Sequence, residues 1–383
     1  MSGERQSSGA VPTALPGVVR QVVERSDAEI ETWHAEQLWG MGFIGAVHRY
    51  EGTATTGGTS RPWSVIRKHV TDTGSTEAHL RYWRREPLVY STGLLDELRG
   101  ATAPRCFAQV DDAAGIELWL EDIATSDNAW STNDWERVGI ALAQMAAPFA
   151  CGQRPPQHGW LSHRWLEGWT EQAAPSFAEF DQAVGDPHLA QLYPPAVAAV
   201  ARSLWEQRHD LCRRLRASTP VLGHLDVVPA NIRLPDDRVV LLDWAFTGHA
   251  ALGEDLATLI GVNGLFGGPP PSQMAEIDAV VFPAYIEALR EAGWGGDASD
   301  VRFAYCASAA LRHCVGVSAF FISGIVPPGD VVDVGGLRNE SQRAFFVESF
   351  GRPIDEIVEI VGASFAFLTL TLGNEALQVH ANG

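Results

Sequence analysis

The sequence predicts an α+β protein with two lobes, and two observations support this. Before about residue 121, runs rich in β-branched and aromatic residues alternate with turn-forming glycines, which predicts a small antiparallel sheet with one main helix. From Asn133 onward, apolar residues recur mainly at helical spacing, which predicts a larger, mainly helical lobe. At 383 residues the chain is long enough for both. We expect a disordered N-terminus over residues 1–16, the first lobe over 17–121 and the second over 122–383.

The expected elements of the first lobe follow from local patterns. Two β-rich runs flank the glycine- and proline-containing segment Gly52–Pro62, which predicts two strands joined by a hairpin loop. A further pair of runs surrounds the turn Asp111–Gly115. Pro87 could interrupt the helix expected between these two pairs. The predicted elements are a helix over Val18–Glu31, strands over Ile44–Tyr50 and Trp63–Val70, a helix over Thr76–Tyr90, and strands over Arg105–Val110 and Ile116–Glu121.

The second lobe is expected to be helical, with one exception. In the segment Asn231–Asp243, two apolar runs surround a Pro-Asp-Asp turn and predict a short β-hairpin. The predicted helices cover Asp134–Ala150, Pro195–Arg216, Asp255–Val262, Gln273–Ala292, Val301–Ile322 and Pro353–Leu370.

Composition excludes several classes of function. A formal net charge of −19 argues against a nucleic-acid partner, because phosphate backbones require a basic surface. This charge would suit a cationic small substrate, but it could equally serve solubility alone. We find no apolar run long enough to span a bilayer and no N-terminal signal, so we expect a cytoplasmic protein without a membrane partner. The sequence does not distinguish a monomer from a homodimer.

The five cysteines are scattered along the chain and have no CxxC spacing. They predict reduced, mostly buried thiols rather than a disulfide framework or a zinc site, which agrees with a cytoplasmic protein. These residues are Cys106, Cys151, Cys212, Cys306 and Cys314.

Lys68 is the only lysine among 28 basic side chains, and it lies in the strand-like run Trp63–Val70. A compact ammonium can bind between phosphate oxygens as a point charge, which a guanidinium does less well. Upstream lies a glycine-rich turn with Gly40, Gly42 and Gly45. Such a turn followed by a strand with one lysine is typical of a phosphate-binding loop. In a dinucleotide-binding fold such a turn would instead be followed directly by a helix.

A second motif carries side chains suited to phosphoryl transfer. It runs from His224 through Asp226 to Asn231, and Asp243 follows at the end of the predicted hairpin. Phosphoryl transfer to a hydroxyl needs a carboxylate that orients the alcohol and accepts its proton, and it needs oxygen ligands for Mg²⁺. Asp226 fits the first role, and Asn231 and Asp243 fit the second. The alternative is a purely structural role for each residue in a turn or at a strand end.

Taken together, these segments resemble the aminoglycoside phosphotransferases and the choline kinase-like small-molecule kinases, which share the protein-kinase fold. The resemblance covers residues 38–260. It implies a protein-kinase-like two-lobe fold, ATP and Mg²⁺ as cofactors, and a small molecule with a hydroxyl group as the acceptor. The matching positions are Gly40, Gly42, Gly45, Val47, Lys68, Leu120–Ile123, His224, Asp226, Asn231, Asp243 and Trp244.

The resemblance also implies a role for each matching residue. Asp226 would be the catalytic base, with Asn231 and Asp243 as metal ligands. His224 and Asp255 would support the catalytic loop. Asp255 would do so as a helix cap and loop brace, with a substrate contact as the alternative. The implied nucleotide-binding residues are Gly40, Gly42, Phe43, Ile44, Gly45, Val47, Ile66, Lys68, Glu86, Leu120, Glu121 and Ile123.

Adenine would then meet the backbone carbonyl of Glu121 and the backbone N–H of Ile123. A glutamate in the helix of the first lobe would pair with Lys68. Glu86 is our choice, but the following proline disfavours helical dihedrals at this residue, so Glu77 is the alternative.

The acceptor is less constrained by the sequence. Trp160, Trp165 and Arg312 are candidates for its binding. The tryptophans could instead pack between helices, and Arg312 could instead satisfy a buried carboxylate. We expect a kinase for an aminoglycoside or another antibiotic, or alternatively for a metabolic sugar, amino alcohol or nucleoside. An alternative from another class is a nucleotide-binding pseudokinase scaffold, but the base and both metal ligands are present. A protein kinase is disfavoured, because the chain between Asp243 and Asp255 leaves no room for a long activation segment.

Overall fold

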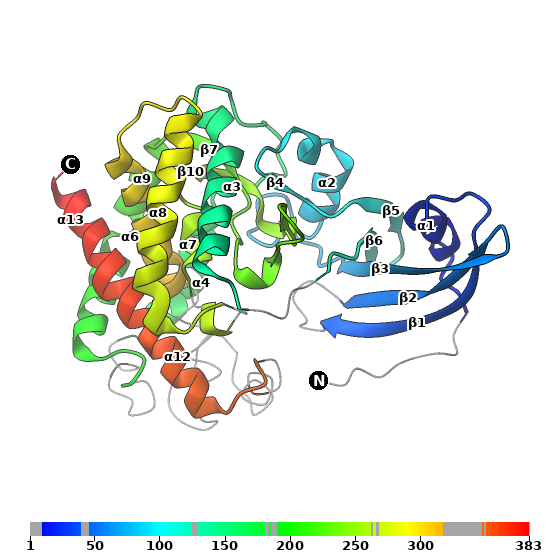
Figure 1. Ribbon diagram of the computed structural model, residues 1–383. Helices are drawn as coiled ribbons and strands as arrows, with labels where there is room; N and C mark the ends of the chain where they lie inside the picture. The colour runs from blue at the N-terminus through cyan, green and yellow to red at the C-terminus, as the bar shows by residue number, and fades with distance from the viewer. Residues whose placement is uncertain are drawn as a thin grey trace.

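The computed structural model describes residues 10–39, 46–124, 129–178, 180, 184, 190–261, 263–265, 268–316, 347 and 350–382. These residues form a sheet lobe and a larger, mainly helical lobe, which lie side by side in Figure 1. The predicted α+β class with two lobes is confirmed.

The first lobe is built on a five-stranded antiparallel sheet with the strand order β1-β2-β3-β6-β5. The central strand is β3, and Lys68 on it lies between Val47 of β2 and Leu118 of β6. The strands are β1 (Glu29–Trp39), β2 (Val47–Thr56), β3 (Thr59–Thr71), β5 (Cys106–Asp111) and β6 (Gly115–Glu121).

The first strand was not predicted. The helix expected over Val18–Glu31 ends early: α1 covers Leu15–Val22, and β1 begins at Glu29. The pairing of β1 with β2 shifts register twice, between Ile30 and Thr32 and again near its end. These irregularities break the alternation of apolar and polar residues by which a strand is recognised in sequence. Helix α1 also begins inside the segment expected to be disordered.

The predicted hairpin is present, but its loop is much shorter than expected. Strands β2 and β3 continue through most of the Gly52–Pro62 segment, and the turn consists of Gly57 and Gly58. Both glycines have positive φ angles, 54° and 79°. Two central residues with positive φ match the right-handed twist of the flanking strands, which is why a two-residue loop suffices.

The helix predicted over Thr76–Tyr90 is also shorter than expected. Only α2, Arg85–Ser91, is helical, so Pro87 lies in the first turn. The N–H groups of a first turn have no partner within the helix, so a proline there removes no hydrogen bond. Pro87 therefore lies near the start of the helix and does not break it.

The two faces of the sheet are covered by different helices. One face packs Tyr50, Trp63, Val65 and Trp119 against α1. Residues alternate between the faces along a strand, so Lys68 belongs to the opposite face. That face is also apolar and includes Val70, Ile116, Leu118 and Leu120, with Tyr90 of α2 packed against it. The lysine therefore points toward the side of the sheet where α2 lies.

The second lobe consists mainly of helices around one hydrophobic core (Figure 1). Helices α3 and α8 pack closely, because a Cβ atom at Gly139 would lie only 3.1 Å from the carbonyl oxygen of Val281. Described helices of this lobe are α3 (Thr132–Ala150), α4 (Trp165–Ala178), α6 (Pro195–Ala217), α7 (Leu256–Leu259), α8 (Met274–Glu291), α9 (Ala298–Ala310), α12 (Ile354–Phe367) and α13 (Asn374–Asn382).

Most predicted helices of this lobe have a counterpart. Helices α4 and α13 were not predicted, and α7 is shorter than expected. The segment predicted as a helix over Val301–Ile322 forms α9 and then a π-helical turn, η6 (Leu311–Gly316); its remaining residues lie outside the described ones. Two small sheets contain β4 (Ala101–Thr102), β8 (Ile232–Arg233) and β9 (Val239–Leu241), and β7 (Pro220–Gly223) with β10 (Gly248–Ala251). Strands β8 and β9 are the predicted hairpin.

The C-terminal segment Ile354–Asn382 is long and apolar enough to cross a membrane by length and composition. The expectation that no apolar run reaches this length is therefore wrong here. The segment combines α12, the π-helical turn η7 (Leu368–Gly373) and α13 into one apolar helical stretch (red in Figure 1). Of its most apolar window, 56% is buried. Its largest apolar residues, such as Phe365 and Leu372, belong to the core of the second lobe.

Candidate active site

The glycine-rich turn cannot be placed. Gly40, Gly42, Phe43, Ile44 and Gly45 lie outside the described residues. The next residue proposed for nucleotide binding, Val47, is the first residue of β2 and pairs directly with Lys68.

Lys68 connects the two lobes electrostatically. Its Nζ lies 2.5 Å from Oε2 of Glu86 on α2 and 2.9 Å from Oδ1 of Asp243 in the second lobe. Lys68 and Glu86 are only 7% and 1% exposed. Burial lowers the pKa of Lys68, but the charges of Asp243 and Glu86 outweigh this effect and raise the pKa overall. The lysine is therefore fully charged at neutral pH, and Glu86 rather than Glu77 is its partner.

His224 is buried and organises the loop that follows it. Its Nε2 lies 2.9 Å from the carbonyl oxygen of Leu242, and the backbone N–H of Asp226 donates to its Nδ1 at 3.3 Å. A carbonyl can only accept, so Nε2 carries the proton and the ring is neutral. Burial lowers the pKa of His224 to about 4, in agreement with this state. The ring therefore fixes loop geometry and does not transfer protons at neutral pH.

Asp255 stabilises the same loop through hydrogen bonds to its backbone. Its carboxylate accepts hydrogen bonds from the backbone N–H groups of His224, at 3.2 Å, and Leu225, at 2.7 Å. It makes no side-chain cap for α7, so the expected capping role is not observed. Thr258 accepts a further bond from the N–H of Val227 at 2.8 Å. These contacts hold Leu225 at a positive φ of 66°. Such a conformation costs on the order of 1–3 kcal/mol and is typical of functional loops.

Asp226 and Asn231 lie next to each other at the end of this loop. The side-chain amide of Asn231 donates to the backbone oxygen of Asp226 at 3.0 Å and to its Oδ2 at 3.1 Å. Burial raises the pKa of Asp226 to about 6, although the charge of Arg312 opposes this rise. Asp226 is thus mainly ionised at neutral pH and close to the range in which a base is effective.

The chemistry of Asn231 and Asp243 fits a magnesium ion. Asn231 uses its amide nitrogen for Asp226, and none of the hydrogen bonds among the described residues uses its amide oxygen. Asp243 directs Oδ1 to Lys68 and keeps a side chain that is 23% exposed. Within the described ranges there is no group of three or more His, Cys, Asp or Glu that could hold a metal. Mg²⁺ does not require one, because it keeps several waters and binds through few carboxylates together with phosphate.

The segment after β6 borders the lysine side of the sheet. Leu120 and Ile123 are buried, at 6% and 7% exposure, and Leu120 pairs with Ile66 of β3. Among the described residues, the backbone N–H of Ile123 has no hydrogen-bond partner. Glu121 uses its side chain for the N–H of Arg105, so its carboxylate faces away from the backbone edge expected to meet adenine.

Two structural residues of this region, Arg49 and Arg85, were missed by the sequence analysis. Arg49 forms a bidentate pair with Asp122, at 2.8 and 3.2 Å, which ties β2 to the segment after β6. Arg85 is 1% exposed and donates hydrogen bonds at 2.9–3.1 Å to four backbone oxygens. Nothing in the sequence distinguishes Arg85 from its neighbour Arg84, so no signal could have found it.

The three candidates for acceptor binding differ in position. Arg312 approaches Asp226, with 3.7 Å between Nη2 and Oδ1. The carbon of the same guanidinium lies 5.5 Å from the ring centre of Trp165. Trp160 is instead stacked on His158 and uses its carbonyl oxygen to bind Arg85. The structure thus brings Arg312 close to the candidate base and Trp165 close to Arg312, whereas Trp160 contacts His158 and Arg85.

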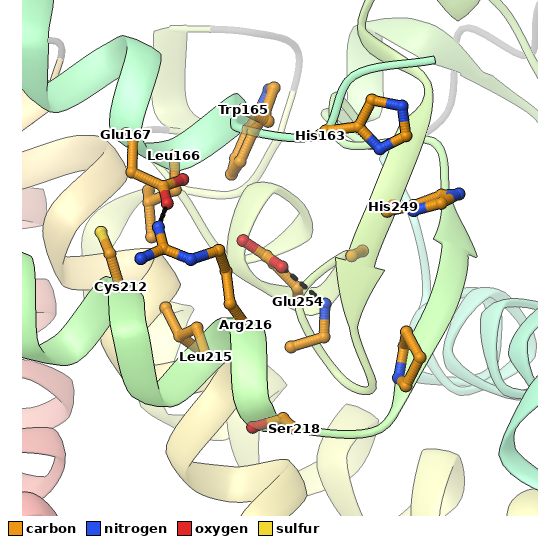
Figure 2. A pocket seen from close by; sticks show the side chains of 13 residues that line it. His163, Trp165, Leu166, Glu167, Cys212, Leu215, Arg216, Ser218, His249 and Glu254 are labelled. Atoms are coloured by element: carbon orange, nitrogen blue, oxygen red, sulfur yellow. Dashed lines mark hydrogen bonds and ion pairs between the residues drawn. The ribbon is translucent and has the colours of Figure 1, made fainter. Parts of the chain in front are cut away.

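A pocket of about 210 Å³ opens elsewhere in the second lobe, between α4, α6 and β10 (Figure 2). Neither Lys68, Asp226 nor Asp243 lines it. Its charged groups are already engaged: Glu167 pairs with Arg216, and Glu254 accepts from the N–H of Ala251 at 2.7 Å. Trp165, one of the acceptor candidates, lines this pocket, but the candidate base and the phosphate-site residues do not.

Comparison with known proteins gives a match in structure alone. The sequence matches no protein-family model and no curated protein. Among solved structures, amicoumacin kinase hAmiN in complex with AMP-PNP, Ca²⁺ and Ami is 13% identical, with 84% of this chain and 88% of that chain covered and a TM-score of 0.50.

Two further neighbours have lower TM-scores, of 0.42 each. An aminoglycoside phosphotransferase APH(3'')-Id from Streptomyces rimosus, in complex with ADP and streptomycin, is 17% identical over 76% of this chain and 96% of that chain. A choline/ethanolamine kinase family protein from Mesorhizobium loti is 14% identical over 86% of this chain and 92% of that chain.

At these identities the likeness shows the fold. The chain has the protein-kinase-like fold of the small-molecule kinases, as its sequence motifs predicted.

Proposed function

We propose that this protein is an ATP- and Mg²⁺-dependent O-phosphotransferase that phosphorylates a hydroxyl group of a small molecule. The observation that carries the proposal is the position of Asp243. It lies 2.9 Å from Lys68 of the sheet lobe and follows the loop that holds Asp226 and Asn231. A phosphate-binding lysine, metal-binding oxygens and a carboxylate base are thus gathered between two lobes. Neighbouring folds that bind AMP-PNP or ADP support the choice of nucleotide.

Each group has a defined task in this reaction. Lys68, held by Glu86, would bind phosphate oxygens of ATP through its ammonium. Asn231 and Asp243 would hold Mg²⁺, which neutralises phosphate charge when bound. Asp226 would orient the acceptor hydroxyl and take its proton. The acceptor oxygen forms a bond to the γ-phosphorus, the bond from that phosphorus to the bridging oxygen breaks, and its electron pair leaves with ADP.

The proposal is tested by Asp226→Asn, since an amide can still fill the space but cannot accept the proton. We expect turnover to fall by about 10²–10⁴-fold, the usual contribution of a positioned base, with ATP affinity largely retained. The measurement is ATP consumption in the presence of an acceptor, together with nucleotide binding by calorimetry.

The matched control is Asp237→Asn, an exposed aspartate in the turn of the β8–β9 hairpin. Turnover of Asp226→Asn at the level of this control would refute the assigned base. Nucleotide binding without turnover of ATP in the wild-type protein, under every acceptor tried, would favour the pseudokinase alternative instead.

The acceptor class remains a choice between antibiotics, such as aminoglycosides, and metabolic sugars, amino alcohols or nucleosides. A screen of ATP consumption against panels of these compounds decides between them. We place the protein in the cytoplasm, where ATP is available and where its five free cysteines would stay reduced.

A further inference from the structure

The guanidinium of Arg312 occupies an unusual position beside the candidate base. Its carbon lies 3.5 Å from the ring centre of Trp169 on α4, and its Nη2 lies 3.7 Å from Asp226. This last distance is too long for a hydrogen bond. The side chains of Arg312 and Asp226 keep exposed fractions of 9% and 17%, so a ligand at Asp226 can also reach Arg312.

The backbone that carries Arg312 is fixed on two sides. Arg312 belongs to the π-helical turn η6, a local irregularity that is frequent at functional sites. The next residue, His313, places its Nε2 3.1 Å from the carbonyl oxygen of Ala257 on α7. At the end of the turn, a Cβ atom on Gly316 would lie only 2.8 Å from Cβ of Trp169. The guanidinium is therefore held in place before any ligand binds.

The hydrogen-bonding capacity of Arg312 is unused. Its Nε and Nη1 are buried and have no hydrogen-bond partner among the described residues. An arginine has five N–H donors, and leaving buried donors of a charged group unsatisfied is costly. Asp226, the nearby carboxylate, is too far away to accept directly from Nη2. Nη2 is not among these buried atoms and lies toward Asp226, so its N–H groups are the ones that a ligand with oxygen acceptors can reach.

We infer that Arg312 is part of the acceptor site and that the acceptor carries an anionic oxygen group, a carboxylate or a phosphate, which this guanidinium binds next to the reacting hydroxyl. The planar fork of an arginine matches both groups with two parallel hydrogen bonds. Trp165 and Trp169 form the aromatic surface on which it lies. The inference rests on the proposed kinase function and specifies its substrate class.

Local charge supports an anionic rather than a cationic acceptor. The overall charge of −19 suits cations, but the charges of two arginines, Arg81 and Arg312, act on Asp226. The guanidinium of Arg81 lies 5.2 Å from the ring centre of Trp169, and the charges of Arg81 and Arg312 oppose each other there. Burial lowers the pKa of Arg312 to about 9, which still leaves it charged at neutral pH. A cationic acceptor would meet the two positive charges of Arg81 and Arg312 against the single negative charge of Asp226.

The phosphoryl transfer is the same as in the proposed function. The hydroxyl of the acceptor gives its proton to Asp226, its oxygen bonds to the γ-phosphorus, and ADP leaves with the electron pair. The anionic group of the acceptor takes no part in bond formation. It only fixes the distance between the hydroxyl and Asp226.

The test begins with ATP consumption by the full-length protein in the presence of Mg²⁺ and matched acceptors. The acidic acceptors are glycerate and gluconate, which carry a carboxylate, and glycerol 3-phosphate and fructose 6-phosphate, which carry a phosphate. The other arms are the neutral counterparts glycerol and fructose, and the cations choline, kanamycin and streptomycin. We expect turnover with at least one acidic arm, with the neutral counterpart of the same skeleton at least tenfold less efficient in kcat/KM, since about one charge-assisted hydrogen bond is lost.

Arg312→Gln then tests the residue. We expect the KM for the acidic acceptor to rise by about 10- to 100-fold, the loss of one or two charge-assisted hydrogen bonds, while the KM for ATP changes little. The matched control is Arg290→Gln, because Arg290 also stacks on a tryptophan, Trp294, at 4.6 Å, but lies at the end of α8. Arg312→Lys should restore part of the affinity, since it keeps the charge but not the fork.

The outcomes separate this inference from the proposed function. Turnover with cationic or neutral acceptors and none with acidic ones overturns the anionic site and leaves the kinase intact. An equal KM for the acidic acceptor in Arg312→Gln and Arg290→Gln also overturns it. Nucleotide binding with no turnover in any arm overturns both proposals.

Discussion

Burial and neighbouring charge act on Asp226 in opposite directions. Burial raises the pKa of its carboxyl, the positive charge of Arg312 lowers it, and the result is about 6. Asp243 adds a negative charge that also raises it. The carboxyl of Asp226 is therefore ionised at neutral pH, but it loses this state under mildly acidic conditions.

The rate of the reaction should follow this titration. We expect kcat/KM to rise with pH through a midpoint of about 6, because the protonated carboxyl cannot accept the hydroxyl proton. Arg312→Gln should move this midpoint upward, since it removes the charge that favours the ionised form. The measurement is a profile of kcat/KM between about pH 5 and about pH 8 with each variant.

Arg290→Gln again serves as the control, and its midpoint should match that of the wild-type protein. A midpoint that is the same in all three proteins would show that Arg312 does not act on the base. A profile without any inflection near pH 6 would show that Asp226 does not limit the reaction in this range.

The same pKa has a consequence for stability. A carboxyl whose pKa is raised in the folded protein binds its proton more tightly there, so it favours folding fully below its ordinary pKa and loses this contribution as the pH rises through about 6. At neutral pH the ionised Asp226 therefore destabilises the fold. The melting temperature of Asp226→Asn at pH 7 should equal or exceed that of the wild-type protein, so its loss of turnover is not a loss of folding.

Helix α2 depends on its surroundings because it is short. Its seven residues, Arg85–Ser91, are too few for a helix to be stable alone. Arg85 holds it by donating to the carbonyl oxygens of His79, Leu80, Trp160 and Ala245, of which the last two belong to the second lobe. The next residue in the helix is Glu86, the partner of Lys68. The hydrogen bonds of Arg85 to the second lobe thus also position Glu86.

Arg85→Lys should therefore be costly despite keeping the charge. A lysine cannot reach four carbonyl groups in this fork, so buried acceptors lose their partners, at about 1–3 kcal/mol each. We expect the free energy of unfolding to fall by roughly 2–5 kcal/mol, from urea denaturation, and kcat to fall as well because Glu86 is less well held.

The matched control is its neighbour Arg84→Lys. The Arg84 side chain is 49% exposed and lies 3.7 Å from Asp111, so this change should cost well under 1 kcal/mol. Equal losses in the two variants would show that the backbone contacts of Arg85 do not hold α2.

The two lobes meet through few charged contacts in the site itself. Lys68 comes from the sheet lobe and Asp243 from the helical lobe, and their ion pair spans the junction at which we place the nucleotide. A ligand that binds both lobes only in the folded protein should stabilise the whole molecule.

AMP-PNP with Mg²⁺ should accordingly raise the melting temperature, with a gain of about 2.7 kcal/mol at a ligand concentration of 100 times Kd. Lys68→Met should remove most of this rise, because it removes the ammonium that we propose binds phosphate. Differential scanning fluorimetry with and without the nucleotide measures both.

The control for this change lies next to it on the same strand. Arg67 faces the opposite side of β3, where it pairs with Glu117, so Arg67→Met should keep the rise caused by AMP-PNP. A nucleotide-induced rise in Lys68→Met equal to that in Arg67→Met would contradict the placement of ATP at Lys68.

The chemical residues of the candidate site could be recognised from sequence because they are local. His224, Asp226 and Asn231 lie within one loop, and Asp243 follows at the end of a short hairpin. The reaction demands these side chains at this spacing, and a tight hairpin brings them together almost regardless of the rest of the fold. The antiparallel strands around Lys68 and most helices of the second lobe were predictable for a similar reason, since their periodicity is a property of a continuous segment.

Strand β1 shows why other elements were not predictable. Its irregular register against β2 removes the alternation that marks a strand, so only the pairing itself identifies it. The helical turn η6 is similar, because a π-helical turn has no sequence pattern of its own.

The sequence alone thus determined the kind of fold and indicated Lys68, the candidate base and the two candidate metal ligands. Only the tertiary structure decided that Glu86 rather than Glu77 pairs with Lys68, that Arg85 anchors α2 and that Arg312 lies beside Asp226. The physical reason is distance along the chain: Arg85 binds the carbonyl oxygen of a residue 160 positions away. Contacts of this kind depend on how whole elements pack, and neither composition nor local spacing encodes them.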